Sequence, residues 1–370
     1  MGDGPARPLV VKLRRLDVEG FRSIERLSWS PGDLTVLTGS RAGDLCAAAL
    51  HISNTARGWS SFSEAFSGEP PHPAERFTDG YAETRWFARL GPPEEGALDL
   101  GYEAIIERVE QGHGWAIVYE RFTQEDDFEL KEMLERQGSR AVFTPAHKGP
   151  VLAGTRPPKE QVATLADDLT ALGALSAFYN DKRVQPYTER LAGWRRHGRI
   201  DPSAEGAPRR FEAERVFHDR LSEDGRNLVN ALYSLWDFEA LRAPVLAGLR
   251  VLDPTVTGLS FPLVGEQGLT VALSHDDGRA TELAAMSDEA VAWLLRGAML
   301  CAVSPAPLLV LDAAEDGLPQ GLIAPLAAML RAASERVQVV LTGVSEALDA
   351  ALTEAFAGAP EGPRLVRLEV

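Results

Sequence analysis

The chain has 370 residues, 45% of them hydrophobic and 25% charged, which is the composition of a folded protein with one large or two moderate domains and argues against disorder. Its apolar stretches fall far short of the roughly 20 residues of a membrane span, and its N-terminus lacks a signal-peptide pattern, so we expect a cytoplasmic protein without membrane contact. A formal net charge of −16 disfavours nucleic-acid binding by the surface as a whole, and the two cysteines, Cys46 and Cys301, do not support a disulfide framework or a thiolate zinc site.

The first predicted elements form a pair of strands that leads into a loop. Residues 10–18 alternate apolar and polar side chains, the segment 19–24 turns back, and 34–38 is a short apolar run that ends at Gly39. Three further strand-like runs, separated by segments rich in Gly and Pro or Gln, predict an antiparallel β subdomain. They are residues 84–90, 98–107 and 115–122.

The middle of the chain has a helical pattern. Leu165, Leu169, Leu172 and Leu175 would share one helix face, and residues 210–238 form another amphipathic stretch. We therefore predict that residues 159–249 are largely helical. The apolar runs at 259–264 and 269–273 that follow resemble a hairpin.

The C-terminal part alternates helices and strands, which predicts a mostly parallel sheet. The predicted order is helix 287–303, strand 308–312, helix 318–334, strand 337–342 and helix 345–356. The whole chain then divides into an N-terminal lobe with the antiparallel subdomain at 1–150, a helical insertion at 151–255 and a C-terminal lobe at 256–370.

Residues 34 to 50 look like a strand, a phosphate-binding loop and a helix whose phosphate-holding residues are missing. Laid against G-x-x-x-x-G-K-[ST], Gly39 matches the first glycine, while Asp44 replaces the second, Leu45 the lysine and Cys46 the hydroxyl residue. Leu45 cannot neutralise phosphate, and the Cys46 thiol is a poor ligand for magnesium. We expect Asp44 to cap a helix that begins at Leu45. The candidate loop residues are Gly39, Ser40, Arg41, Ala42, Gly43, Asp44, Leu45 and Cys46.

Several segments, in order and spacing, carry a family resemblance. They are Val18 to Ile24, Leu221 to Leu228, Met286 to Glu289, and Leu308 to Asp312 with Glu315 to Leu318 behind it. Together they resemble the bacterial RecF/SMC-like predicted ATPases of the AAA family, which belong to the ABC-type P-loop group. The resemblance implies an α/β P-loop NTPase fold with a mostly parallel sheet, an antiparallel β subdomain and a helical insertion. It also implies ATP and magnesium as cofactors, dimerisation, and roles in DNA repair, chromosome handling or phage defence.

The chain departs from that family at the positions that do chemistry. Asp312 keeps the place of the Walker B aspartate, which would meet magnesium, and Ser287 keeps the signature serine. Ala313, however, stands where relatives carry the glutamate that activates water, Glu289 stands for a signature glycine, and Val344 for the histidine that senses the γ-phosphate. Glu315 is a possible substitute for the missing glutamate, although we expect it to be a surface or ion-pair residue.

The main hypothesis is a pseudo-ATPase with no catalytic residue and no cofactor, acting as a binding or regulatory module that pairs with itself or another protein through its ATPase face. The alternative is a residual or partner-completed ATPase that binds ATP and magnesium through Asp312 and residues 39–43. A third hypothesis is a nucleic-acid-binding scaffold that uses Arg195, Arg196 and Arg199, which follow Trp194. The simpler interpretation of these arginines is a solvated helix face.

Overall fold

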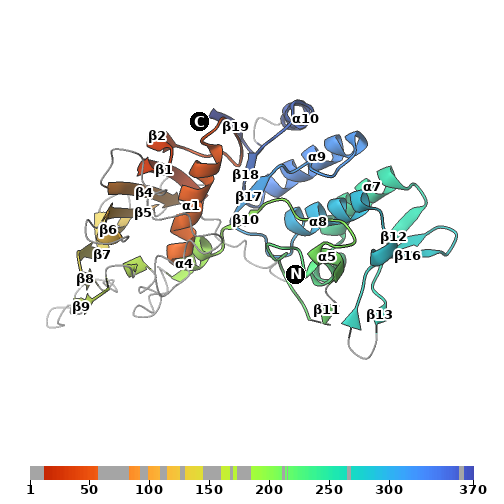
Figure 1. Cartoon of the computed structure of the whole chain (residues 1–370), viewed down its shortest axis with the longest axis horizontal. Coiled ribbons are helices and arrows are strands. Elements are labelled where there is room, and N and C mark those ends of the chain that lie inside the picture. The colour runs from red at the N-terminus through yellow and green to blue at the C-terminus, as the bar shows by residue number, and fades with distance from the viewer. Residues whose placement is uncertain are drawn as a thin grey trace, which may run out of the picture. The chain divides into compact units, whose positions relative to one another are not determined.

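The computed structural model describes residues 12–56, 83–91, 99–108, 115–125, 130–144, 160–166, 170–172, 185–210, 213–214, 216–264, 268–357 and 362–370. The chain divides into two compact units (Figure 1). The first unit comprises Met1–Pro31 and Gly39–Trp194, and the second comprises Gly32–Thr38 and Arg195–Val370. Each unit contains a large sheet of its own.

The first unit is built on an eight-stranded antiparallel sheet with the order β2-β1-β4-β5-β6-β7-β8-β9. Buried and exposed residues alternate along β1, so that one face carries apolar side chains such as Leu16 and Val18. The strands are β1 Lys12–Phe21, β2 Ile24–Trp29, β4 Glu83–Gly91, β5 Asp99–Arg108, β6 Trp115–Glu125, β7 Leu130–Gln137, β8 Arg140–Phe143 and β9 Gln161–Thr164, and the helices are α1 Ala42–Ala56 and α4 Gln185–Ala192.

A fully buried ion pair lies in this sheet. Arg136 on β7 donates to the Glu120 carboxylate on β6 at 3.1 Å, and the Tyr102 hydroxyl donates to the same carboxylate at 2.9 Å. The backbone N–H of Ala171 also donates to Glu120, at 2.7 Å, and Arg136 donates to the Ala166 carbonyl. The pair therefore fastens the segment that follows β9 onto the sheet.

The second unit contains a five-stranded parallel sheet with the order β10-β17-β18-β3-β19. The sequence explains its central strands, because β3, β17 and β18 are short apolar runs whose residues are almost all buried, as expected of a sheet covered on both faces. The strands are β3 Leu34–Thr38, β10 Arg195–His197, β17 Leu308–Asp312, β18 Gln338–Thr342 and β19 Leu365–Glu369.

Helices and two small antiparallel sheets complete the second unit. The helices are α5 Ala207–Arg210, α6 Leu228–Trp236, α7 Glu239–Leu252, α8 Asp288–Leu300, α9 Ile323–Ser334 and α10 Glu346–Phe356, with short 3-10 turns at Leu283–Ala285 and Gln320–Leu322. One small sheet joins β11 Ala213–Glu214, β14 Gly268–Leu269 and β13 Leu263–Val264; the other joins β12 Val256–Ser260, β15 Ala272–His275 and β16 Ala280–Glu282. Trp293 of α8 is fully buried in the core, where its indole N–H donates to the Val245 carbonyl of α7 at 2.8 Å.

The C-terminal elements confirm the sequence prediction closely, since β17 has the predicted bounds and β18, α8, α9 and α10 lie within a few residues of theirs. The expectation of a mostly parallel sheet holds for the five-stranded sheet alone, because the larger sheet is antiparallel. The predicted hairpin is present as the pairs β12–β15 and β13–β14.

The middle of the chain corrects the prediction of a largely helical segment at 159–249. It contains β9, β10 and β11 as well as helices, and β10 belongs to the parallel sheet. Leu165 follows β9 instead of starting a helix, Leu172 is buried, and Leu169 and Leu175 lie outside the described residues. The two compact units also do not follow the three predicted ranges, because β3 groups with the C-terminal part. In the part of the chain that the structure describes, no helix is long and apolar enough to cross a membrane.

Candidate functional site

The carboxyl ends of the parallel strands form one row. Asp312 at the end of β17 is in register with Thr342 at the end of β18, and Thr342 is in register with Leu37 near the end of β3. Open α/β sheets usually bind ligands at this edge. The sequence placed the Walker B-like aspartate and the start of the phosphate-binding loop here, so the row is the candidate site.

The loop after β3 is too short to hold a phosphate in the expected way. Only Gly39, Ser40 and Arg41 separate the strand from α1. Gly39 has a φ of 93°, which suits a glycine at a sharp turn. The backbone N–H of Leu45 is already bonded to the Arg41 carbonyl at 3.0 Å, as part of the helix. A phosphate loop needs such N–H groups to point at the ligand.

The side chains that replace the lysine and the hydroxyl residue point into the core. Leu45 is 0% exposed and Cys46 is 1% exposed, and the other cysteine, Cys301, is buried as well. Burial raises the pKa of the Cys301 thiol to about 12. Of the other loop residues, Ser40, Arg41 and Gly43 are exposed and Ala42 is buried.

Asp44 does not cap the helix in the way that the sequence suggested. Because α1 begins at Ala42, Asp44 lies inside its first turn. Its carboxylate accepts hydrogen bonds from the backbone N–H and the hydroxyl of Ser23, and forms an ion pair with Arg22 at 3.3 Å. Arg22 and Ser23 form the turn between β1 and β2 within the family-like segment Val18 to Ile24. Asp44 therefore joins α1 to this turn. Its negative charge in the first turn also interacts favourably with the helix dipole.

Asp312 already has a cation as its partner. The Arg196 guanidinium at β10 donates through Nε to Oδ2 of Asp312 at 2.7 Å, and Nη2 lies 2.7 Å from the same oxygen. The other oxygen, Oδ1, accepts the Thr342 hydroxyl at 2.5 Å. The carboxylate therefore already has a cation and a hydroxyl as partners. Asp312 and Thr342 thus do not fit a magnesium ion while Arg196 stays in place.

We predict that Arg196→Met lowers the free energy of unfolding by about 1 kcal/mol, because a charge-assisted pair at a partly buried carboxylate is lost. A double-mutant cycle with Asp312→Asn, followed by urea titration, isolates the coupling between the two side chains. Arg199→Met is the matched control: Arg199 pairs with Asp316, but its side chain is 80% exposed, so no change beyond error is expected. Equal effects of the two variants would contradict the prediction.

The turn after β17 is held by several hydrogen bonds. Ala313, at the position of the missing glutamate, has a φ of 46°, and its N–H donates to the Thr342 carbonyl at 2.8 Å. Buried Arg296 of α8 donates to the carbonyls of Ala314 at 2.7 Å and Asp316 at 3.0 Å. Glu315, expected at the surface or in an ion pair, instead accepts the backbone N–H of Ser345 and is half-buried.

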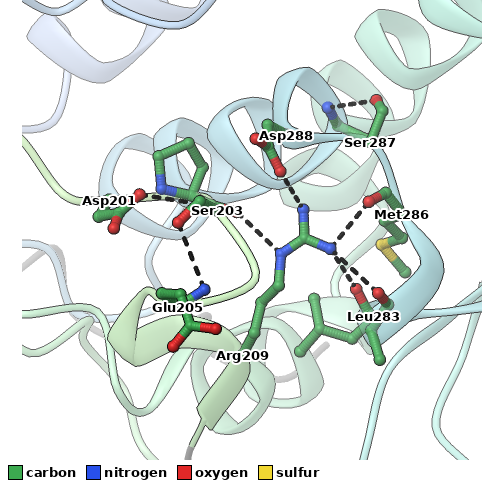
Figure 2. A network of polar contacts seen from close by, with 11 residues as sticks. Asp201, Ser203, Glu205, Arg209, Leu283, Met286, Ser287 and Asp288 are labelled. Atoms are coloured by element: carbon green, nitrogen blue, oxygen red, sulfur yellow. Dashed lines mark hydrogen bonds and ion pairs between the residues drawn. The ribbon is translucent and has the colours of Figure 1, made fainter.

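The signature-like segment is held by Arg209 (Figure 2). Its side chain is 4% exposed, and Nη1 donates to the carbonyls of Leu283 at 2.9 Å and Met286 at 2.8 Å. Nη2 bonds the Asp288 carboxylate at 2.7 Å, and Nε donates to the Pro202 carbonyl at 2.8 Å. One guanidinium thereby connects the segment before α8 to the segment before α5.

The N-terminus of α8 is satisfied by its own residues. Ser287 is the N-cap, and its hydroxyl accepts the N–H of Ala290 at 3.2 Å. The Glu289 carboxylate accepts hydrogen bonds from its own backbone N–H and from the Ser287 hydroxyl. Both bonds lower the pKa of Glu289, the first more than the second. With Asp288 and Glu289 in the first turn, the helix end already carries negative charge. An incoming phosphate would be repelled there.

The segment Leu221 to Leu228 has a structural explanation. Asn227, the N-cap of α6, accepts the N–H of Ser222 at 2.7 Å, and the Asp224 carboxylate accepts the Ser222 hydroxyl at 2.8 Å. Gly225 between them has a φ of 74°, and a Cβ at this position would lie only 3.0 Å from Ile200 and 3.1 Å from Leu295. This family-like segment is thus a packed turn that begins α6.

The basic strip is not a helix face, because Arg195 and Arg196 lie on the strand β10 and Arg199 follows it. Arg195 and His197 are on β10, where burial and then the charge of Arg220 lower the pKa of Arg195. Trp194, before the strand, is buried. His197 is also buried, and its Nδ1 has no hydrogen-bond partner among the described residues. Its pKa falls to about 4, because of burial and then the charges of Arg195 and Arg296.

His197 should make the protein sensitive to mild acid. Because its folded pKa of about 4 lies below the ordinary 6.5, the unfolded chain binds the proton first as pH falls. Neutral His197 therefore contributes fully to the free energy of unfolding above pH ~6.5, and this contribution is lost as the pH falls toward ~4. Between pH 7 and pH 5 the free energy of unfolding should fall by roughly 2 kcal/mol. Urea titrations at these two pH values should show a smaller loss for His197→Leu than for the parent chain. An identical loss in both would contradict the role of His197.

No group of three or more His, Cys, Asp or Glu side chains that could hold a metal ion occurs among the described residues. The candidate loop, Asp312 and Ser287 are each bonded to other parts of the chain. The fold and the site define an α/β protein with a five-stranded parallel sheet. At the carboxyl edge of this sheet, Asp312 is bonded to other side chains of the protein.

Comparisons with known proteins return solved structures. No protein-family model matches the chain, and no curated protein matches it. The chain is similar to the SMC head domain from Thermotoga maritima, with 10% identity, 92% of each chain covered and a TM-score of 0.43. It is also similar to a Smc head domain with an extended coiled coil, bound to the C-terminal domain of ScpA and derived from Pyrococcus furiosus, with 10% identity, 92% of each chain covered and a TM-score of 0.48. At these values the likeness assigns no family.

Proposed function

We propose that this protein is a pseudo-ATPase, a chain with a P-loop ATPase-like fold that has lost its catalysis and acts as a binding or regulatory module. One observation carries the proposal, the pairing of Asp312 with Arg196 and Thr342. Magnesium prefers oxygen ligands that are free to coordinate it, and a neighbouring guanidinium repels it. The aspartate that would hold the ion is therefore bound to an internal cation instead.

The remaining parts of the candidate site support the same conclusion. Leu45 and Cys46 are buried where a lysine and a hydroxyl would have to reach the phosphates. Ala313 has no group that could orient or activate water. Ser287 and Glu289 bond to α8 itself. Loss of one charge-stabilising group already costs on the order of 3 kcal/mol of transition-state stabilisation, so little hydrolysis is expected to survive.

Neither alternative has an observation in its favour. A residual ATPase would use Asp312, whose two carboxylate oxygens are both bonded. A nucleic-acid scaffold would use Arg196 and Arg199, whose charges are offset by Asp312 and Asp316 in a chain with a net charge of −16. The proposed partner is thus a protein.

Calorimetric titration with ATP and magnesium tests the proposal, with phosphate release followed in the same samples. The parent chain and Asp312→Ala are both expected to give no binding heat at millimolar nucleotide and no phosphate. Binding heat that disappears in Asp312→Ala would overturn the proposal, and phosphate release on top of it would establish a working ATPase. Thermal melts of both proteins show that they are folded.

A further inference from the structure

Four large apolar side chains are exposed beside the small sheet β11–β14–β13. They are Val216, Phe217, Leu263 and Val264, with 47%, 59%, 63% and 42% of their surfaces exposed. Val216 and Phe217 follow β11 closely, and Leu263 and Val264 form β13. We call these four residues the β11–β13 surface; Figure 1 shows β11 and β13 at the lower edge of the second unit.

The exposure of Phe217 is fixed by hydrogen bonds on both sides. The Val216 carbonyl accepts Nδ2 of Asn230 at 2.8 Å, and the His218 N–H donates to the Ser234 hydroxyl at 3.1 Å. Asn230 and Ser234 are buried residues one turn apart on α6. Phe217 between these anchors is consequently held in an ordered segment while its ring stays in solvent.

The β13 side is anchored in a similar way. Just before the strand, the Phe261 ring packs edge-on against Tyr233 of α6, with centroids 5.4 Å apart. Leu263 pairs with Leu269 and Val264 with Gly268 on β14. Successive strand residues point to opposite faces, so exposure of both Leu263 and Val264 leaves both faces of β13 uncovered by the described residues. Within those residues β13 pairs with β14 alone, which makes it an edge strand.

The charges around the surface indicate the partner. Asp219, two residues after Phe217, and Asp237, which follows Trp236 in the sequence, are exposed, and the Trp236 ring packs against Phe261. The neighbouring guanidiniums of Arg220 and Arg242 are half-buried and bond the carbonyls of Ser304 and Trp236. With a net charge of −16, a second copy of the chain would be repelled. The complementary ligand is apolar and basic.

We propose that the β11–β13 surface binds an extended segment of a partner protein, rich in apolar and basic residues, which adds as a strand beside β13. Edge strands accept such segments through backbone hydrogen bonds, while side-chain contacts provide selectivity. The surface lies outside the carboxyl edge of the parallel sheet, so this inference goes beyond the pseudo-ATPase proposal and does not depend on it.

Two labelled synthetic peptides of equal length, one alternating valine with arginine and one alternating valine with glutamate, are titrated with the full chain in the absence of nucleotide. Fluorescence anisotropy should show binding of the arginine peptide only. The double variant Phe217→Ser, Leu263→Ser should weaken it about tenfold or more, as expected when apolar anchor residues are lost. Both substitutions leave the charge unchanged, so general attraction to an acidic protein would not be affected by them. Val162→Ser is the matched control, an exposed apolar residue of the first unit.

Equal binding of both peptides, or an affinity that the double variant leaves unchanged, would overturn the proposal. So would self-association of the parent chain in light scattering that the double variant abolishes, because the occupant would then be a second copy. Circular dichroism and thermal melts of the variants exclude misfolding as the cause of lost binding.

Discussion

Restoring the two missing loop residues with Leu45→Lys and Cys46→Ser is expected to destabilise the protein, by roughly 4 kcal/mol, and not to restore ATP binding. Leu45 is fully buried on α1, so a lysine there must either bury its ammonium group or push the helix away from its neighbours. The short turn of Gly39 to Arg41 would still lack the N–H groups that surround a phosphate. Urea titration and calorimetry with ATP and magnesium measure the two parts of the prediction.

Ser40→Lys is the matched control for this experiment. Ser40 is exposed in the same turn, so a lysine there should change the free energy of unfolding by less than about 0.5 kcal/mol. A stable double variant that binds ATP would show that the loop had lost only its side chains. It would also show that the short turn from Gly39 to Arg41 can accommodate a phosphate.

A second large effect is expected from Arg209→Met. The substitution removes the Arg209 donor from the carbonyls of Pro202, Leu283 and Met286, of which Leu283 keeps the Met286 N–H, and the methionine fits the buried space only in part. We expect a loss of about 3–5 kcal/mol in the free energy of unfolding, as for other broken buried charge networks. Hydrogen exchange should increase in residues 283–290 first, because the guanidinium holds that segment.

The neighbouring Arg210 provides the control for Arg209. Its side chain is 62% exposed and pairs with Glu205 at the surface, so Arg210→Met should cost less than about 1 kcal/mol. Similar losses for both variants, or no change in exchange at 283–290, would mean that Arg209 does not hold the signature-like segment.

Much of the second unit was predictable because its elements have strong local patterns. The apolar runs of β17 and β18 are typical of buried strands, and the helix α9 between them favours a parallel pair. β10 was missed because Arg195 to His197 reads as polar and helical when neighbours are unknown. Its strand conformation comes from pairing with β17, more than 100 residues away in the chain, as the register Arg196 to Val310 shows.

The sequence showed which functional residues of the candidate site are replaced, but it did not show which side chains of the site bond to one another. Sequence patterns identified Leu45, Cys46 and Ala313 as departures, since their chemistry is visible in their identity. They could not show that Arg196 pairs with Asp312, because that contact joins residues 116 positions apart. The same holds for Arg209, whose partners are mostly backbone carbonyls that any sequence would offer. A tertiary contact of this kind has no local signal.

The position of β3 also has a consequence for how the chain is made. β3 lies between β18 and β19 in the parallel sheet, although about 300 residues separate it from both in the sequence. During synthesis β3 leaves the ribosome early. It stays unpaired, with its apolar side chains exposed, until its two partner strands have emerged. The antiparallel sheet of the first unit is completed by chain translated in between, so it can fold first. Slow closure of such distant strands should make newly synthesised chains depend on chaperones more than a protein of this size with local contacts.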